Sequence, residues 1–163
     1  MAATSDGASD RVVTVERVIA APPEKIFDVI ADPRRHPELD GSGTVRVAAA
    51  DSPARLSLGA TFSMAMKFGV KYQMVNTVVE FEEGRRIAWA PHPVFRGKVL
   101  EKRAGRVWRY ELEPVPEGTR VRETWDATKE KGFALHRLAR VPRRTAKGME
   151  QSLFNLHRLV TGA

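Results

Sequence analysis

The stretch TFSMAMKF at residues 61–68 alternates strictly between large apolar side chains and small or polar ones. Phe62, Met64, Met66 and Phe68 fall on one side, and Thr61 begins the other. A period of two residues is typical of a β-strand with one buried face. Because Gly69 interrupts the pattern and residues 70–81 resume it, the stretch predicts one arm of an antiparallel hairpin.

Downstream of this hairpin, short runs of β-branched and aromatic residues predict strands over 86–90, 107–113 and 119–127. The turns between them fall at residues 82–84 and 116–118, where glycine and proline interrupt the pattern. Two prolines, at 91 and 93, are expected to end the first of these strands and to leave His92 in a loop. For residues 94–103 an irregular strand and an edge strand both remain open.

Upstream, residues 1–10 are small, polar and acidic and are expected to be a flexible terminus. A strand is predicted over 12–20, followed by a short helix that opens on Pro22 and Pro23. Pro33 stops that helix, and residues 34–39 are expected to form another turn or two. A further strand is predicted over 44–50.

The last part of the chain changes to helical periodicity, which predicts a long helix over about 142–161. Its apolar stripe has the spacing of one helix face and consists of Ala146, Met149, Leu153, Leu156 and Val160. This order predicts an α+β helix-grip fold, with a curved antiparallel sheet of six to seven strands wrapped around the C-terminal helix. Residues 11–163 are expected to form one ligand-binding domain, because 163 residues leave too little chain for a second core.

Composition excludes several functional classes. The chain has no cysteine, which excludes disulfides, thiolate metal sites and a cysteine nucleophile. No Gly-x-Gly-x-x-Gly, phosphate-binding loop or Gly-x-Ser-x-Gly occurs, and the four histidines lack metal-binding spacing. We therefore expect no cofactor and no metal.

Without a signal sequence or a long apolar run, the protein is expected to be cytoplasmic.

Four segments resemble the polyketide cyclase/dehydrase and lipid-transport superfamily (SRPBCC): VER (15–17) leading to APPEKIFDVIADP (21–33), VEFEEGRRIAW (79–89), WRYELEP (108–114) and GTRVRETW (118–125). The resemblance extends over roughly residues 12–160. These motifs mark helix starts, turns and cavity walls, so the resemblance implies a helix-grip fold with a cavity and does not specify an activity.

The apolar face of 61–68 is the strongest candidate for a cavity wall, because aromatic rings and flexible thioethers suit irregular apolar ligands. Ordinary core packing explains the same pattern, and the resemblance favours the cavity. The expected ligand-binding set comprises residues of several strands and of the last helix: Phe62, Met64, Met66, Phe68, Tyr72, Met74, Trp89, Trp108, Tyr110, Trp125, Met149, Leu153 and Leu156.

Three polar residues in phase with these walls are the candidates for chemistry. Asn76 could position a ligand carbonyl, and Tyr110 could orient or protonate a ligand, although a core tyrosine is the commoner case. Glu123 is in phase with Val121 and Trp125. It is either a cavity carboxylate with a raised pKa that acts as general acid or base, or an exposed cross-strand partner of an arginine, and the exposed alternative is the commoner case.

Three functions follow from these observations. The leading hypothesis is a carrier or sensor that binds a lipid, polyketide or aromatic metabolite, as a monomer or homodimer. The second is a cofactor-independent cyclase or dehydratase. The third uses the basic segment 129–147 to bind nucleic acid, an anionic membrane or an acidic protein, although a solvated helix face explains that segment more simply. Its cations are Lys129, Lys131, Arg137, Arg140, Arg143, Arg144 and Lys147, in a chain of net charge +7.

Overall fold

The computed structural model describes residues 10–48, 50–100, 105–131 and 140–163. The elements are β1 (Val12–Ile19), α1 (Pro23–Ala31), the 3-10 helix η1 (Pro33–Arg35), α2 (His36–Leu39), β2 (Val45–Ala48), β3 (Thr61–Phe68), β4 (Val70–Glu82), β5 (Arg86–Phe95), β6 (Lys98–Val99), β7 (Val107–Val115), β8 (Gly118–Asp126) and α4 (Val141–Thr161). None of the helices in these ranges is both long and apolar enough to span a bilayer.

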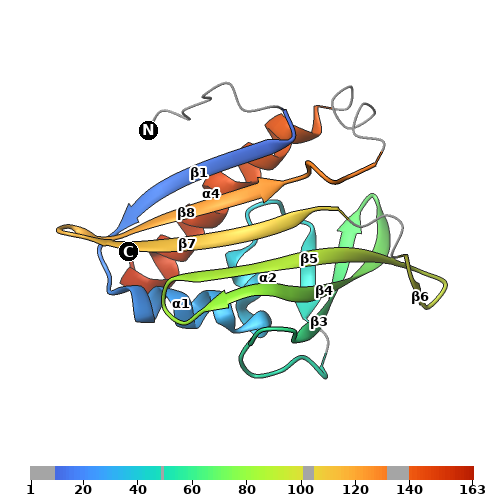
Figure 1. Cartoon of the computed structure of the whole chain (residues 1–163), viewed down its shortest axis with the longest axis horizontal. Helices are drawn as coiled ribbons and strands as arrows, with labels where there is room; N and C mark the ends of the chain where they lie inside the picture. Colours follow the sequence, from blue (N-terminus) through green and yellow to red (C-terminus); the bar gives the residue numbers. More distant parts are fainter. Residues whose placement is uncertain (1–9, 49, 101–104, 132–139) are drawn as a thin grey trace.

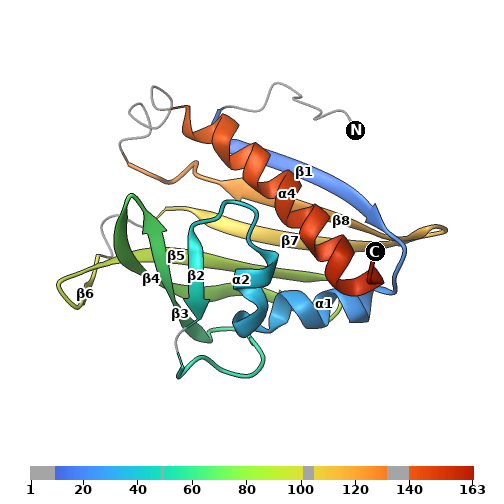
Figure 2. The same cartoon turned by 180° about the vertical axis from the view of Figure 1, so that it is seen from behind.

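The strands form one antiparallel sheet in the order β1-β8-β7-β5-β4-β3-β2, with the short β6 paired to β5 (Figure 1). Seen from behind, α4 crosses one face of this sheet, and α1 and α2 lie on the same side (Figure 2). Each strand therefore has one face toward the helices and one toward solvent. The helix-grip fold expected from the sequence is confirmed.

The core lies between the sheet and α4, where the apolar stripes of both meet. Met149, Leu153, Leu156 and Val160 of α4 are buried, as the helical periodicity predicts, and Ala146 is half-buried. Gly162 adopts a left-handed conformation and closes the helix through its N–H to the Arg158 carbonyl. The helix predicted over 142–161 is thus confirmed with a one-residue difference at its start.

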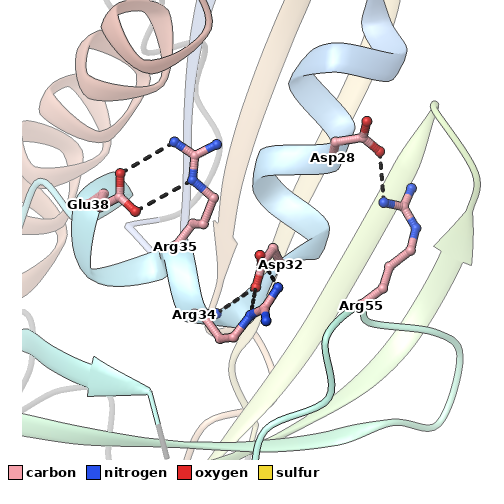
Figure 3. A network of polar contacts seen from close by, with 6 residues as sticks. All are labelled: Asp28, Asp32, Arg34, Arg35, Glu38 and Arg55. Carbon is pink, nitrogen blue, oxygen red and sulfur yellow. Dashed lines mark hydrogen bonds and ion pairs between the residues drawn. The ribbon is translucent and has the colours of Figure 1, made fainter.

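The α1–η1–α2 unit is held in place by local ion pairs (Figure 3). The Arg34 guanidinium donates to both oxygens of Asp32, at 2.8 Å and 2.7 Å, and Asp32 also accepts the Arg34 N–H as the cap of η1. Because these hydrogen bonds favour the ionised form, the pKa of Asp32 lies below its usual range. Arg55 pairs with Asp28 of α1 at 2.7 Å, which fixes the loop that leads into β3.

A close backbone approach sets the distance between this unit and α4. A side chain at Gly41 would lie 2.2 Å from the Gly148 carbonyl oxygen and 2.4 Å from the Ser152 nitrogen, so only glycine fits. The Gly41 N–H donates to the Ser152 hydroxyl at 2.9 Å. The loop after α2 is therefore fastened to the middle of α4, and α2 is held beside the centre of the core.

The prediction that the strand starting at residue 86 ends at residue 90 is wrong. The strand continues through Pro91 and Pro93 to Phe95, and His92 is half-buried within it rather than in a loop. β7 pairs with β5 only as far as Trp89, so the prolines lie beyond the last pair on that side and break no ladder there. Part of the open segment 94–103 is thereby assigned, since residues 94–95 belong to β5 and 98–99 form β6, while residues 101–104 lie outside the described ranges.

Candidate functional site

Glu123 is the most unusual polar residue of the interior. It lies on β8, where its register partners are Val15 of β1 and Tyr110 of β7, and its side chain points to the helix-covered face. Only 2% of Glu123 is exposed. The exposed alternative, with an arginine across the strand, is therefore wrong. The period-two pattern placed Glu123 in phase with Trp125 correctly, but it could not establish that this face is fully covered.

Burial raises the pKa of the Glu123 carboxyl to about 8, because the ionised form loses its hydration. Hydrogen bonding from Tyr110 acts in the opposite direction, and the negative charge of Asp40 raises the pKa further. At neutral pH the carboxyl is thus largely protonated and can donate a hydrogen bond. Its Oε2 atom has no hydrogen-bond partner among the described residues.

Tyr110 supplies a second polar group beside this carboxyl. It is buried, and burial together with the nearby Glu123 raises the pKa of its phenol well above the usual value. The phenol therefore keeps its proton and remains a hydrogen-bond donor. The interior thus holds a protonated carboxyl and a phenol on adjacent strands, which is an arrangement suited to a neutral ligand with an oxygen acceptor.

An aromatic cluster of His36, Phe62, Trp89 and Tyr110 adjoins the carboxyl. Trp89 is its centre: the Tyr110 ring lies 5.7 Å away, the His36 ring stacks on it at 5.0 Å, and the Phe62 edge meets it at 5.8 Å, all measured between ring centroids. Phe62 also meets His36 edge-on at 5.4 Å. Such contacts fix the positions of the rings and provide flat apolar surface next to Glu123.

His36 belongs to this cluster, although no pattern in the sequence distinguishes it from the other histidines. Its Nε2 donates to the Ile30 carbonyl at 2.8 Å, so the ring is the Nε2-protonated tautomer. Burial lowers the pKa of His36 to about 4, and the ring is neutral at physiological pH. Its three-residue spacing from Leu39 could have indicated that His36 is buried, because residues three apart lie on one face of a helix. Both side chains are buried on one face of α2.

Asn76, the third polar candidate, is buried on β4 opposite Phe62. Its Nδ2 donates to the Phe62 carbonyl at 3.4 Å. This long bond engages the amide nitrogen in a contact between strands. Asn76 therefore lies beside Phe62 of the aromatic cluster. In the sheet, β5 separates the strand of Asn76 from that of Tyr110, and β5 and β7 separate it from that of Glu123.

The expected wall residues gather on the helix-covered face, with differing burial. Met66, Tyr72, Met74 and Trp108 are half-buried, and the side chain of Phe68 is not among those that the structure describes. The remaining eight are buried: Phe62, Met64, Trp89, Tyr110, Trp125, Met149, Leu153 and Leu156. The half-buried group lies toward one end of the sheet, where the interior is more open to solvent.

A separate groove of about 320 Å³ lies on the opposite, solvent-facing side of the sheet. It is lined mostly by arginines and glutamates of the β4–β5 and β7–β8 turns, among them Arg85, Glu111 and Arg120. A charged groove of this kind does not suit an apolar ligand. Within the described ranges, no group of three or more histidine, aspartate and glutamate side chains is arranged to hold a metal ion.

Comparison with known families fits this geometry. The family model described as "Polyketide cyclase / dehydrase and lipid transport" matches residues 10–161. The chain belongs to this family. The resemblance noted in the four sequence segments is therefore confirmed over almost the whole described chain. Membership in the polyketide cyclase/dehydrase and lipid-transport family indicates ligand binding in general terms.

Relatives with known sequences or structures support the fold. An uncharacterised protein of Mycobacterium tuberculosis is 36% identical over 144 residues, which is 85% of this chain, and the chain spans only 59% of that relative's length. A solution structure of a protein from Arthrobacter aurescens has a TM-score of 0.73 at 13% identity and covers 99% of this chain and 94% of its own. A crystal structure from Mesorhizobium loti has a TM-score of 0.68 at 19% identity, covering 94% and 98%.

Proposed function

We propose that the protein binds a hydrophobic small molecule between the sheet and α4 and acts as its carrier or sensor. The observation that carries the proposal is the buried Glu123 carboxyl, whose Oε2 has no hydrogen-bond partner among the described residues. A buried polar atom without a partner costs free energy, and a ligand that supplies the partner recovers that cost. The family to which the chain belongs supports the same function.

The chemistry around Glu123 narrows the ligand class. The Tyr110 phenol donates a hydrogen bond to Glu123, and the protonated carboxyl can in turn donate to a ligand, so the preferred ligand carries a carbonyl or hydroxyl oxygen. An anionic group is disfavoured there, because Asp40 already places negative charge near the pair. The stacked rings of Trp89 and His36 offer a flat apolar surface, which suits a ligand with a planar or unsaturated carbon skeleton. A polyketide, an aromatic metabolite or a lipid with a polar oxygen has these properties.

Prodan, a fluorescent naphthyl ketone, is a suitable probe for this site. We expect saturable binding with a blue-shifted emission, and we expect Glu123→Leu to weaken it by about tenfold, because one hydrogen bond to the ketone is lost. Glu111→Leu is the matched control, since Glu111 lies on the solvent-facing side of neighbouring β7. Equilibrium fluorescence titration of the three proteins measures the effect.

Two outcomes would count against the proposal in different ways. An absence of saturable Prodan binding, together with no small molecule retained in native mass spectra of the protein from its own host, would overturn ligand binding. Equal affinities of the wild type and Glu123→Leu would keep ligand binding and remove Glu123 from the site.

A second candidate function is a cofactor-independent cyclase or dehydratase. It is favoured by the pKa of Glu123, because a carboxyl with a pKa of about 8 can both donate and accept a proton near neutral pH. In this proposal Glu123 transfers the proton, Tyr110 binds the developing oxyanion, and the enclosed interior excludes water. Asn76 remains a more distant candidate.

Enzymatic activity is tested with Glu123→Gln, which retains size and hydrogen bonding but cannot transfer the proton. We expect kcat on a poly-β-ketone substrate to fall by about 100-fold to 10,000-fold, with Prodan affinity nearly unchanged. Tyr110→Phe should lower kcat by a smaller factor. Chromatography of the cyclised products measures both, and a Glu123→Gln variant with full turnover would exclude Glu123 as the proton donor.

A further inference from the structure

β1 forms one border of the sheet and is paired on one side only. It pairs with β8 along all 8 of its residues, and no strand within the described ranges pairs with its other side (Figure 1). The unpaired backbone groups of such an edge can bind another strand. β1 contains neither proline nor glycine, and its register with β8 is continuous. It therefore offers a long and regular edge for pairing.

The other free edges of the sheet are less suited to pairing. β2 has only 4 residues, and its register with β3 shifts between Val45 and Val47. Beyond Trp89, where β5 no longer pairs with β7, Pro91 and Pro93 lack the N–H that a pairing strand needs. Short strands, irregular pairing and prolines are common ways in which sheets block their edges. None of these features occurs in β1.

The backbone groups of β1 that point away from β8 can be identified from one hydrogen bond. The Arg11 carbonyl accepts the Ala127 N–H at 2.7 Å, so the backbone groups of residue 11 point toward β8. Successive residues of a strand direct their backbone groups to alternate sides. The hydroxyls of Thr14 and Thr124 lie 3.2 Å apart, as expected for an opposed pair without backbone hydrogen bonds. The free N–H and C=O groups therefore belong to Val12, Thr14, Glu16 and Val18.

The side chains of β1 leave this edge unguarded. Charged side chains often protect an edge strand, but both charges of β1 are engaged within the chain. Glu16 accepts a hydrogen bond from Arg122 of β8 at 2.5 Å, and the Arg17 guanidinium lies over the Phe154 ring of α4, 5.4 Å from its centroid. The remaining residues of β1 are valine, threonine and isoleucine, which favour strands. Val18 and Phe154 add exposed apolar surface beside the edge.

We propose that a second copy of this chain occupies the β1 edge, so that two β1 strands pair antiparallel about a twofold axis and the two sheets become one. A twofold axis pairs a surface with itself, and an antiparallel pair of identical strands satisfies this condition. Both copies of α4 then lie on the same face of the continuous sheet. This homodimer goes beyond the proposed ligand binding and does not depend on it.

The charges and length of β1 favour one register. With Val15 opposite Val15 of the second copy, residues 12–18 pair, Thr14 lies opposite Glu16, and no like charges oppose each other. Moving the second copy by two residues in one direction places the two Glu16 side chains directly opposite each other, which is unfavourable. Moving it by two in the other direction shortens the pairing to residues 12–16. A shift of one residue would place solvent-facing side chains opposite inward-facing ones.

This register also covers apolar surface beside the edge. Val13 of one copy lies opposite Arg17 of the other, on the side of the sheet that α4 covers. Because Phe154 lies against Arg17, its ring comes next to Val13 of the second copy. On the solvent-facing side, the exposed Val18 meets Val12 of the second copy. Burial of these apolar side chains adds to the stabilisation from the backbone hydrogen bonds.

The homodimer is tested by sedimentation equilibrium of the full chain, for which we expect a concentration-dependent equilibrium between monomer and dimer. Thr14→Pro removes an N–H that faces the free edge and leaves the β1–β8 hydrogen bonds in place. It should raise the dissociation constant of the dimer by about 30-fold, because one hydrogen bond is lost in each of two symmetric pairs. Thr14→Ala is the matched control, because it loses the same hydroxyl and keeps the N–H. It should remain within about twofold of the wild type.

Three results decide the outcome of this experiment. A wild type that sediments as a monomer at every concentration up to its solubility limit would overturn the proposal. Equal dissociation constants for Thr14→Pro and Thr14→Ala would also overturn it, because the contact would then lie elsewhere. Circular dichroism shows whether Thr14→Pro is folded. If it is not, cysteine variants that retain every backbone N–H decide the question.

The register is tested with single cysteines, because the chain contains none. Val15→Cys should form a disulfide-linked dimer on mild oxidation. Opposed residues without backbone hydrogen bonds bring their Cα atoms to about 4.5 Å, which a disulfide can span. Val13→Cys is the matched control on the same side of β1, and its two copies would lie about 13 Å apart along the strands. Non-reducing electrophoresis measures the linked fraction. Equal linkage at the two positions, or linkage at neither, would overturn the proposed pairing.

Discussion

Glu123→Gln is expected to unfold at a higher denaturant concentration than the wild type at pH 8, and at nearly the same concentration at pH 4.5. The pKa of Glu123 is about 8 in the folded protein and 4.5 in the unfolded chain. Between these values the unfolded state releases a proton that the folded state keeps, so the free energy of unfolding falls as pH rises. The fall is about 1.4 kcal/mol per pH unit, or about 5 kcal/mol over the whole interval.

Glutamine resembles the protonated carboxyl and does not titrate, so the variant should lack this dependence. The measurement is urea unfolding at a series of pH values, followed by tryptophan fluorescence. Glu111→Gln serves as the control, because it removes a carboxyl from the solvent-facing side of β7. If the difference in unfolding free energy between wild type and Glu123→Gln stayed constant with pH, the carboxyl would not be buried and protonated in the native state.

On acidification, His36→Gln should lose less of its free energy of unfolding than the wild type. The pKa of His36 is about 4 in the folded protein and 6.5 in the unfolded chain, because burial disfavours the imidazolium. As pH falls through this interval the unfolded state binds a proton that the folded state does not bind, which lowers the free energy of unfolding by about 3 kcal/mol. Glutamine does not titrate, and its amide can donate to the Ile30 carbonyl in place of Nε2.

The matched variant is His36→Ala, which removes the titration and also the hydrogen bond and ring contacts. It should be several kcal/mol less stable than the wild type at neutral pH, because a large buried side chain is deleted. Guanidinium unfolding of the three proteins at neutral and acid pH distinguishes the two effects. A wild type and His36→Gln that lose the same stability on acidification would contradict a buried neutral His36.

The sequence and the structure agree where a repeating pattern shows which side of an element is buried. The alternation of 61–68 identified β3, and Phe62 and Met64 are buried as expected. The spacing of Met149, Leu153, Leu156 and Val160 identified α4 and its buried face. Pro22 and Pro23 marked the start of α1, because proline is tolerated in the first helical turn.

Residues whose environment depends on distant segments could not be assigned in the same way. Periodicity placed Glu123 on the same side as Trp125, but its burial requires that α4 and the α2 region cover that side of the sheet. His36 acquires its role from Trp89 and Phe62, which are more than twenty residues away in the sequence. Pro91 and Pro93 remain within β5 because β7 pairs with that strand only up to Trp89.

The sequence by itself therefore determined the helix-grip fold, the family resemblance and the set of apolar residues that face inward. Only the tertiary structure decided which polar groups share that interior. The physical reason is that periodicity depends on neighbours along one element. Burial, pKa and charge depend on which other elements the folded chain brings to the same place.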